Sequence, residues 1–134
     1  MKVVVLNCRD RHIIDDMDRL ARRISRSIAP KRTSVNLVLV NDRRIQELNR
    51  RYLRRNRPTD VLAFPLEPVL PKAILSRNTK LLGEVYVSRE QARRQAKAAG
   101  ISYYAEVRRL ALHGILHLLG FNHREMEPVY GRYL

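Results

Sequence analysis

Apolar positions along the chain follow two periods, one typical of strands and one typical of helices. Short runs rich in Val, Ile and Leu predict β-strands over residues 2–7, 34–40, 61–64 and 82–88. Longer segments in which apolar residues recur every three or four positions predict amphipathic helices over residues 15–28, 43–53, 89–99 and 103–119. Strands and helices therefore intersperse along one short chain.

Proline and glycine mark the predicted ends of these elements. Pro30 ends the first helix, while Gly100 and Gly120 end the third and fourth. Residues 65–80 contain three prolines and no clear period, which predicts a loop. Pro128 argues against a further long helix after His123. We predict an α+β fold in which residues 1–134 form a single domain. One mixed β-sheet packs against helices, and the histidine motif described below lies on a C-terminal helix and the following turn.

Composition changes this picture mainly through charge. Lys and Arg number 27 against 13 acidic residues, a formal net charge of +14, and most of the excess is arginine. Such a surplus attracts polyanions, and arginine adds bidentate contacts to phosphate. Ordinary surface use of arginine explains the same numbers, so charge alone does not assign a function. No run approaches the ~20 apolar residues that cross a membrane, and the single cysteine, Cys8, is typical of a reducing compartment.

Three of the four histidines fall within eleven residues, at His113, His117 and His123. Residues four apart share one helix face, so His113 and His117 can present two imidazoles to one ion. Gly120 allows the backbone to leave the helix and bring His123 back as a third ligand. Three protein ligands with an open fourth position are typical of a catalytic zinc. We therefore predict one Zn²⁺ per chain, although three histidines also suit nickel or copper.

The residue after the first histidine helps to distinguish between kinds of hydrolase. Helix-borne zinc proteases have glutamate there as the general base, and this chain has Gly114. Glu84 or Glu125 would have to substitute. Cleavage of a phosphodiester does not depend on this glutamate, because metal and guanidinium groups can stabilise the charge of the reacting phosphate. The sequence thus favours a nuclease over a peptidase.

Arginines crowd the end of the second predicted helix and the loop that follows. We take four of them as candidate contacts to a phosphate backbone: Arg51, Arg54, Arg55 and Arg57. Pro58 and Asp60 follow at once and predict a firmly held entry into the short strand at 61–64. A loop fixed at a sheet end is a good platform for substrate.

Three segments together resemble the YbeY family of metal-dependent endoribonucleases. They are residues 48–65, which include Pro58-Thr59-Asp60-Val61-Leu62, residues 82–87, and the histidine motif at 113–123. The resemblance implies cleavage of single-stranded RNA and a part in ribosomal RNA maturation, at the end of the small-subunit RNA, and in ribosome quality control. It also implies a zinc-like ion on the three histidines. Ribosomal RNA and small-subunit ribosomal proteins are the partners it implies, in the cytoplasm or in an organelle of bacterial origin.

Three positions depart from the family pattern. The family usually has a functional arginine directly after the aromatic residue of the second helix, and here Leu53 follows Tyr52. Arg54 is our candidate for this catalytic role, with Arg51 as the other choice. Asn122 replaces the usual aspartate before the last histidine, and Glu84 replaces the more common aspartate after Gly83.

Three functions remain open from the sequence. The first is a metal-dependent endoribonuclease, favoured by the histidines, the charge and the resemblance. The second is a non-catalytic RNA- or ribosome-binding module with a structural metal, which the Leu53 and Asn122 departures favour. The third is a metallopeptidase, which the spacing of the histidines favours and Gly114 opposes.

Overall fold

Strands and helices are interspersed along the chain, as predicted. The computed structural model describes residues 1–29, 32–66 and 80–134. Their elements are β1 (Lys2–Leu6), α1 (Arg11–Ser25), β2 (Thr33–Val40), α2 (Asp42–Leu53), β3 (Val61–Pro65), β4 (Lys80–Ser88), α4 (Arg89–Ala99), α5 (Tyr103–Leu118) and α6 (His123–Tyr133). The predicted loop over 65–80 lies mainly outside the described residues, and Lys80 already belongs to β4.

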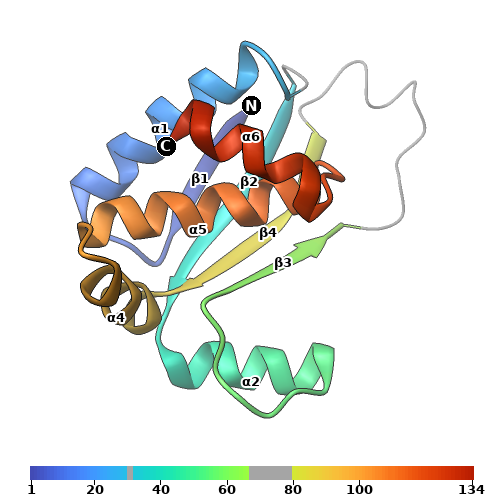
Figure 1. Ribbon diagram of the computed structural model, residues 1–134. Coiled ribbons are helices and arrows are strands. Elements are labelled where there is room, and N and C mark those ends of the chain that lie inside the picture. The colour runs from blue at the N-terminus through green and yellow to red at the C-terminus, as the bar shows by residue number, and fades with distance from the viewer. Residues whose placement is uncertain (30–31, 67–79) are drawn as a thin grey trace.

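The sheet is mixed, with the strand order β1-β2-β4-β3 (Figure 1). β1 and β4 each pair with β2 in parallel, and β3 pairs antiparallel with β4. Among the described strands, β3 is therefore an edge strand that pairs on one side. The α+β prediction and the mixed sheet are confirmed.

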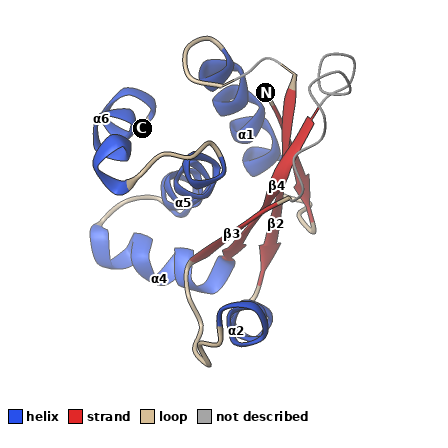
Figure 2. Ribbon diagram, turned by 90° about the vertical axis from the view of Figure 1, so that its right-hand side faces the viewer, coloured by secondary structure: helices blue, strands red, loops and turns tan. Residues whose placement is uncertain are grey.

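Most helices cover one face of this sheet (Figure 2). Along β2, Val35, Leu37 and Leu39 are buried while Ser34, Asn36 and Val38 are only half-buried. The buried positions pack with α1 and α5 in the main core, and α6 lies on the outer side of α5 (Figure 2). Alternate residues point to opposite faces of a strand, so the half-buried set faces the other side. No helix in the described ranges is long and apolar enough to span a membrane.

In the part of the chain that the structure describes, α2 covers the second face of the sheet, and it does so only in part. Ile45 and Leu48 of this helix pack with Val40 and Leu62 in a separate small cluster. Val38, Phe64 and Tyr86 border the cluster and remain half-buried. This partial cover leaves aromatic side chains of the sheet accessible beside α2.

The first helix begins four residues earlier than predicted. Asp10 caps it, because its carboxylate accepts a hydrogen bond of 3.0 Å from the backbone N–H of His12. The apolar positions that predict the helix begin at Met17, so their period does not reach its first turn. An aspartate cap is a signal that the sequence contained.

The prediction of a short tail without a further long helix is wrong. α6 spans eleven residues with Pro128 inside it. Proline inside a helix costs about 3 kcal/mol or more. Asn122 and Glu125 offset this with a complete capping box, and the buried side chains of Met126, Val129 and Tyr133 join the main core.

Close approach of α5 to β4 depends on Gly114. A Cβ added there would lie 2.9 Å from Cγ2 of Val85 and closer still to Cγ1, inside van der Waals contact. Val85 is fully buried. A side chain of any size at position 114 would therefore push the histidine helix away from the sheet. The glutamate that zinc proteases have at this position has no room.

We predict that Gly114→Ala destabilises the protein by about 1–3 kcal/mol, because overpacking exceeds the gain in helix propensity. Gly131→Ala is the matched control, since a Cβ there meets nothing within 4 Å and alanine favours the helix by up to about 1 kcal/mol. Urea denaturation of both variants measures the difference. Equal stability of Gly114→Ala and the unmodified protein would contradict the packing described.

Candidate metal centre

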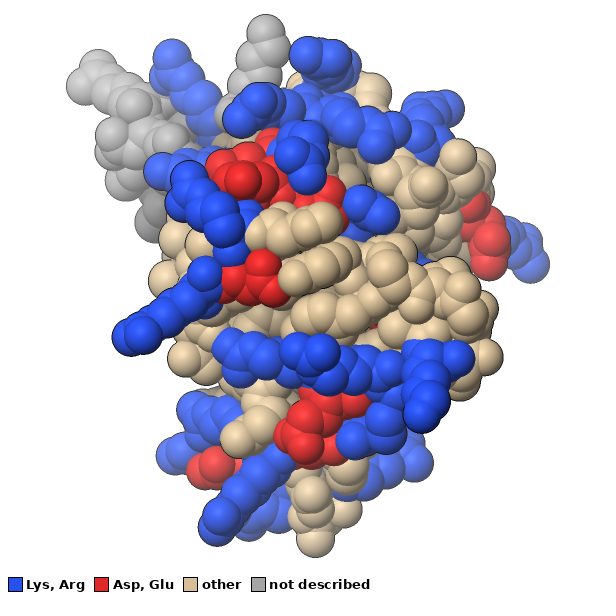
Figure 3. All heavy atoms as spheres, turned by 90° about the vertical axis from the view of Figure 1, so that its left-hand side faces the viewer, with Lys and Arg blue, Asp and Glu red and all other residues tan. Residues whose placement is uncertain are grey.

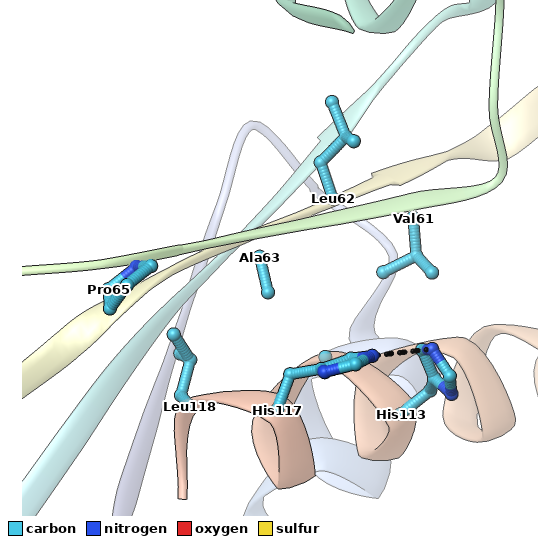
Figure 4. Close-up of a pocket in the computed structure, with 8 residues that line it drawn as sticks. Val61, Leu62, Ala63, Pro65, His113, His117 and Leu118 are labelled. Carbon is cyan, nitrogen blue, oxygen red and sulfur yellow. Dashed lines mark hydrogen bonds between the residues drawn. The ribbon is translucent and has the colours of Figure 1, made fainter. Parts of the chain in front are cut away.

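A pocket of about 310 Å³ opens between β3 and the C-terminal half of α5 (Figure 4). Among the described residues its lining comes from these two elements: Val61, Leu62, Ala63 and Pro65 from β3, and His113, Gly114, His117 and Leu118 from α5. In Figure 4, Val61 and Ala63 point from the strand toward the histidine helix. Apolar side chains thus form one wall and imidazoles the other.

α5 places two histidines on the same side, one turn apart. The Nε2 atoms of His113 and His117 lie 3.1 Å from each other. Two nitrogens that share a tetrahedral zinc at 2.0–2.1 Å lie about 3.4 Å apart. The spacing therefore suits two ligands of one ion with only a small adjustment.

The turn after α5 brings in the third histidine. Gly120 has φ +87°, in the left-handed region that glycine adopts without strain. The Asn122 side chain then accepts a hydrogen bond from the backbone N–H of Glu125, at 2.9 Å, and starts α6. His123 is the first residue of α6. It therefore lies at the start of a further helix, directly after the turn on which it was predicted. Asn122 therefore has a local structural role as a cap.

Ligand atoms of His113, His117 and His123 all lie within 4.8 Å of one another. His113 is half-buried, while His117 and His123 are exposed. Burial first, and then the charges of His117 and His123, lower the pKa of His113. Burial also lowers the pKa of His117, followed by the charge of His123. These shifts favour the neutral form of His113 and His117, which is the form that binds metal. The three-histidine set could hold a metal ion with a side open to solvent.

Tyr130 of α6 supports the first histidine from behind. Its hydroxyl lies 2.6 Å from Nδ1 of His113, so Nδ1–H can donate to it while Nε2 faces the other histidines. Such outer contacts fix the tautomer and orientation of a ligand. The sequence analysis missed Tyr130, because it did not predict the helix that positions it.

Arg109 lies one turn before His113 on α5 and brings positive charge to the centre. Its Nε and Nη2 donate to the buried carboxylate of Glu106 at 2.6 and 2.7 Å. This pairing raises the pKa of Arg109. The negative charge of Asp60 acts on both His113 and Arg109 and raises the pKa of each. Arg109 also escaped the sequence analysis, although its four-residue spacing from His113 was a usable signal.

The four candidate arginines lie together around the end of α2. Arg51 belongs to the last turn, Arg54 caps the helix with φ +57°, and Arg55 and Arg57 follow before β3. All four are exposed. Among the described residues none of them is ion-paired with a carboxylate. Their guanidinium groups are therefore available to an outside anion.

Basic charge is not confined to that end of the molecule. Figure 3 shows the side of the molecule where α1 and α5 begin, and Lys and Arg dominate it as well, with acidic groups among them. Net charge by itself therefore does not locate a path for a polyanion.

Neither proposed substitute for the missing protease base is placed for that task. Oε1 of Glu125 accepts a hydrogen bond of 3.0 Å from the backbone N–H of Asn122, within the capping box. Glu84 pairs with Phe64 and Asn36 across the sheet, on the face opposite the histidines.

Fold and site together define a small α+β protein with an open three-histidine centre of the kind that binds a metal. The family described as Endoribonuclease YbeY matches residues 6–129 of the chain. The chain belongs to this family.

Relatives from several bacteria support the assignment. Endoribonuclease YbeY of Geobacter metallireducens is 34% identical, with 98% of this chain and 87% of the relative covered. The Desulfitobacterium hafniense protein of the same name is 44% identical over 79% of this chain and 69% of its own length. The match to the Persephonella marina protein, at 40% identity, covers only 58% of that relative. A solved structure from Thermotoga maritima has a TM-score of 0.60 at 27% identity and covers 92% of this chain and 75% of its own.

Removing the hydroxyl behind His113 should weaken metal binding. We expect Tyr130→Phe to lower zinc affinity about 10- to 100-fold, the usual effect of losing such a support. Competition with a chromophoric chelator measures the affinity. Tyr104→Phe is the matched control. Tyr104 lies at the opposite end of α5 from His117, and its hydroxyl donates to Asp10. Equal losses in the two variants would remove the role assigned to Tyr130.

Stability of the metal-free protein should fall as the pH drops below about 6.5. The pKa values of His113 and His117 are lowered in the folded chain, so the unfolded chain takes up protons first, near its pKa of about 6.5. The contribution of these histidines to the free energy of unfolding is therefore fully present above that pH. It is lost progressively as the pH falls toward the lower pKa values of the folded chain. Urea titrations between about pH 8 and 5.5 measure it. His117→Asn should show a shallower decline, and an unchanged slope would speak against burial of these imidazoles.

Proposed function

We propose that this protein is a metal-dependent endoribonuclease that cleaves single-stranded RNA. The observation that supports it most is the convergence of His113, His117 and His123 beside an open pocket. The relatives are named endoribonucleases, and the net charge of +14 suits a polyanionic substrate. The family resemblance extends the proposal to ribosomal RNA maturation, at the end of the small-subunit RNA, and to ribosome quality control.

The three histidines would hold one Zn²⁺, and other divalent transition metals suit the same ligands. When bound, zinc supplies positive charge at a phosphodiester and lowers the pKa of water toward about 7. Tyr130 keeps Nε2 of His113 directed at the other two rings. Val61 and Ala63 supply an apolar wall that limits water around the substrate.

Arginines would bind and orient the RNA backbone. Arg51, Arg54, Arg55 and Arg57 are exposed at the end of α2 that leads into β3, the strand that lines the histidine pocket. We assign the catalytic role to Arg54, whose left-handed backbone at the helix end directs the chain into the loop. Ribosomal RNA, with small-subunit ribosomal proteins as further partners, would be met in the cytoplasm or a bacteria-derived organelle.

A non-catalytic RNA-binding module is the second candidate, because Leu53 stands at the position where the family usually has arginine. Leu53 is 48% exposed at the end of α2, so its side chain is not required by the core. A metallopeptidase is disfavoured, since Val85 leaves no space for a glutamate at position 114.

Cleavage should require the histidine centre. We expect the zinc-loaded protein to cut a labelled single-stranded RNA, a chelator to stop the reaction, and zinc to restore it. His117→Ala should lower the rate at least about a hundredfold, as loss of a metal ligand does to metal-assisted catalysis. His12→Ala is the control, because His12 stacks on Tyr104 away from the centre. Equal rates for His117→Ala and the unmodified protein would refute the proposal, and binding without cleavage under any metal would favour the second candidate.

Arg54→Gln tests the catalytic arginine. We expect kcat to fall at least about tenfold with little change in KM, because a group that stabilises the transition state affects the chemical step. Arg22→Gln on α1 is the control for loss of one positive charge. Steady-state kinetics on the same RNA separate the constants. A rise in KM with unchanged kcat would reduce Arg54 to a binding residue.

A further inference from the structure

A second cleft lies on the opposite face of the sheet from the histidines. It has a volume of about 240 Å³ and is lined by Arg44, Leu48 and Tyr52 of α2 and by Phe64, Glu84 and Tyr86 of the sheet. Strand register explains its floor, because Phe64 pairs with Glu84 and Leu62 with Tyr86 between β3 and β4. Paired residues share a face, so these side chains stand together.

Three aromatic rings give this cleft its shape. The Tyr52 and Phe64 rings meet edge to face with centroids 5.4 Å apart, and Phe64 and Tyr86 do the same at 5.8 Å. Tyr52 is 59% exposed, and large aromatic side chains are seldom so accessible in a folded protein. An exposed ring next to half-buried rings offers a platform on which a flat group can stack.

Charged groups stand at the same cleft. Arg44 and Glu84 both line it, and the guanidinium of Arg51 lies 5.9 Å from the centre of the Tyr52 ring. Burial, and next the charge of Glu84, raise the pKa of Tyr86, so its hydroxyl stays protonated at neutral pH. Aromatic faces combined with arginine and a hydrogen-bonding carboxylate are the usual means of recognising unpaired bases.

The cleft and the histidine pocket share one strand. Leu62 and Phe64 of β3 face the side of α2, while Val61 and Ala63 face the histidines (Figure 4). β3 is the edge of the sheet, so a chain that crosses this edge reaches both faces within the thickness of one strand. The candidate arginines lie directly before β3 and would accompany that path.

We infer that the cleft between α2 and the open face of the sheet binds one unpaired nucleobase of the RNA, stacked on Tyr52, next to the segment held at the histidines. Glu84 accepts a hydrogen bond from the base. Bases with an exocyclic amino group are preferred over uracil, because the one base donor of uracil, N3–H, lies between two carbonyl oxygens that the carboxylate repels. The inference rests on the proposed function in naming RNA as the ligand, and it assigns a specificity subsite to that RNA.

Binding measurements on the chelator-treated full chain test the subsite apart from cleavage. Fluorescence anisotropy with labelled oligo(C) and oligo(U) of about ten nucleotides gives the affinities. We expect Tyr52→Ala to weaken oligo(C) binding at least about fivefold, the lower end of what stacking of one base contributes, and Tyr52→Phe to restore it. Leu53→Ala is the matched control, since Leu53 is the exposed neighbour on α2, and should change binding less than about twofold.

Glu84→Gln tests the choice of base. We expect the unmodified protein to favour oligo(C) over oligo(U), and Glu84→Gln to reduce this preference because an amide can also donate to uracil. Circular dichroism of each variant confirms folding. Unchanged oligo(C) binding in Tyr52→Ala would overturn the inference.

Each proposal can fail alone. An unmodified protein that cuts RNA while Tyr52→Ala binds normally keeps the proposed function and removes the subsite. If the protein does not cut the RNA but its binding still depends on Tyr52 and Glu84, the subsite stands and the proposed nuclease activity is refuted.

Discussion

Contact between Gly114 of α5 and Val85 of β4 determines where the histidines stand. Because Gly114 has no side chain, α5 lies directly on the sheet at the level of β3 and β4. His113 and His117 flank this glycine and are therefore held at a fixed height beside the edge strand. The turn through Gly120 and the start of α6 then bring His123 to the same place. The residue that excludes a protease base thus also builds the pocket.

The helix pair α5 and α6 builds the candidate metal centre as a unit. α5 contributes two of the three histidines, and α6 contributes the third together with Tyr130, whose hydroxyl lies against His113. The cap at Asn122 fixes where α6 begins, and its buried side chains anchor it on the core. Asn122 supports this local geometry as an aspartate would, because both residue types are good caps.

Much of this was predictable from the chain. β-branched runs and helical periodicity predicted each strand and four of the helices in the described ranges, since burial on one face leaves a repeating pattern. The three histidines and the turn at Gly120 were also visible, because they depend on spacing within one segment. Partners that approach from another element were not. Tyr130 depended on α6, where a capping box and buried side chains outweighed Pro128, and Glu84 proved to face the side of the sheet away from the histidines. Strand order and face assignment are tertiary properties, and a single sequence contains no direct signal for them.

X-ray absorption at the zinc edge, on the purified protein loaded with one equivalent of zinc, tests the central claim most directly. Three imidazole nitrogens at about 2.0–2.1 Å and one oxygen ligand in the open fourth position are expected. A shell with a single imidazole, or with sulfur from Cys8, would show that the three histidines do not share one ion.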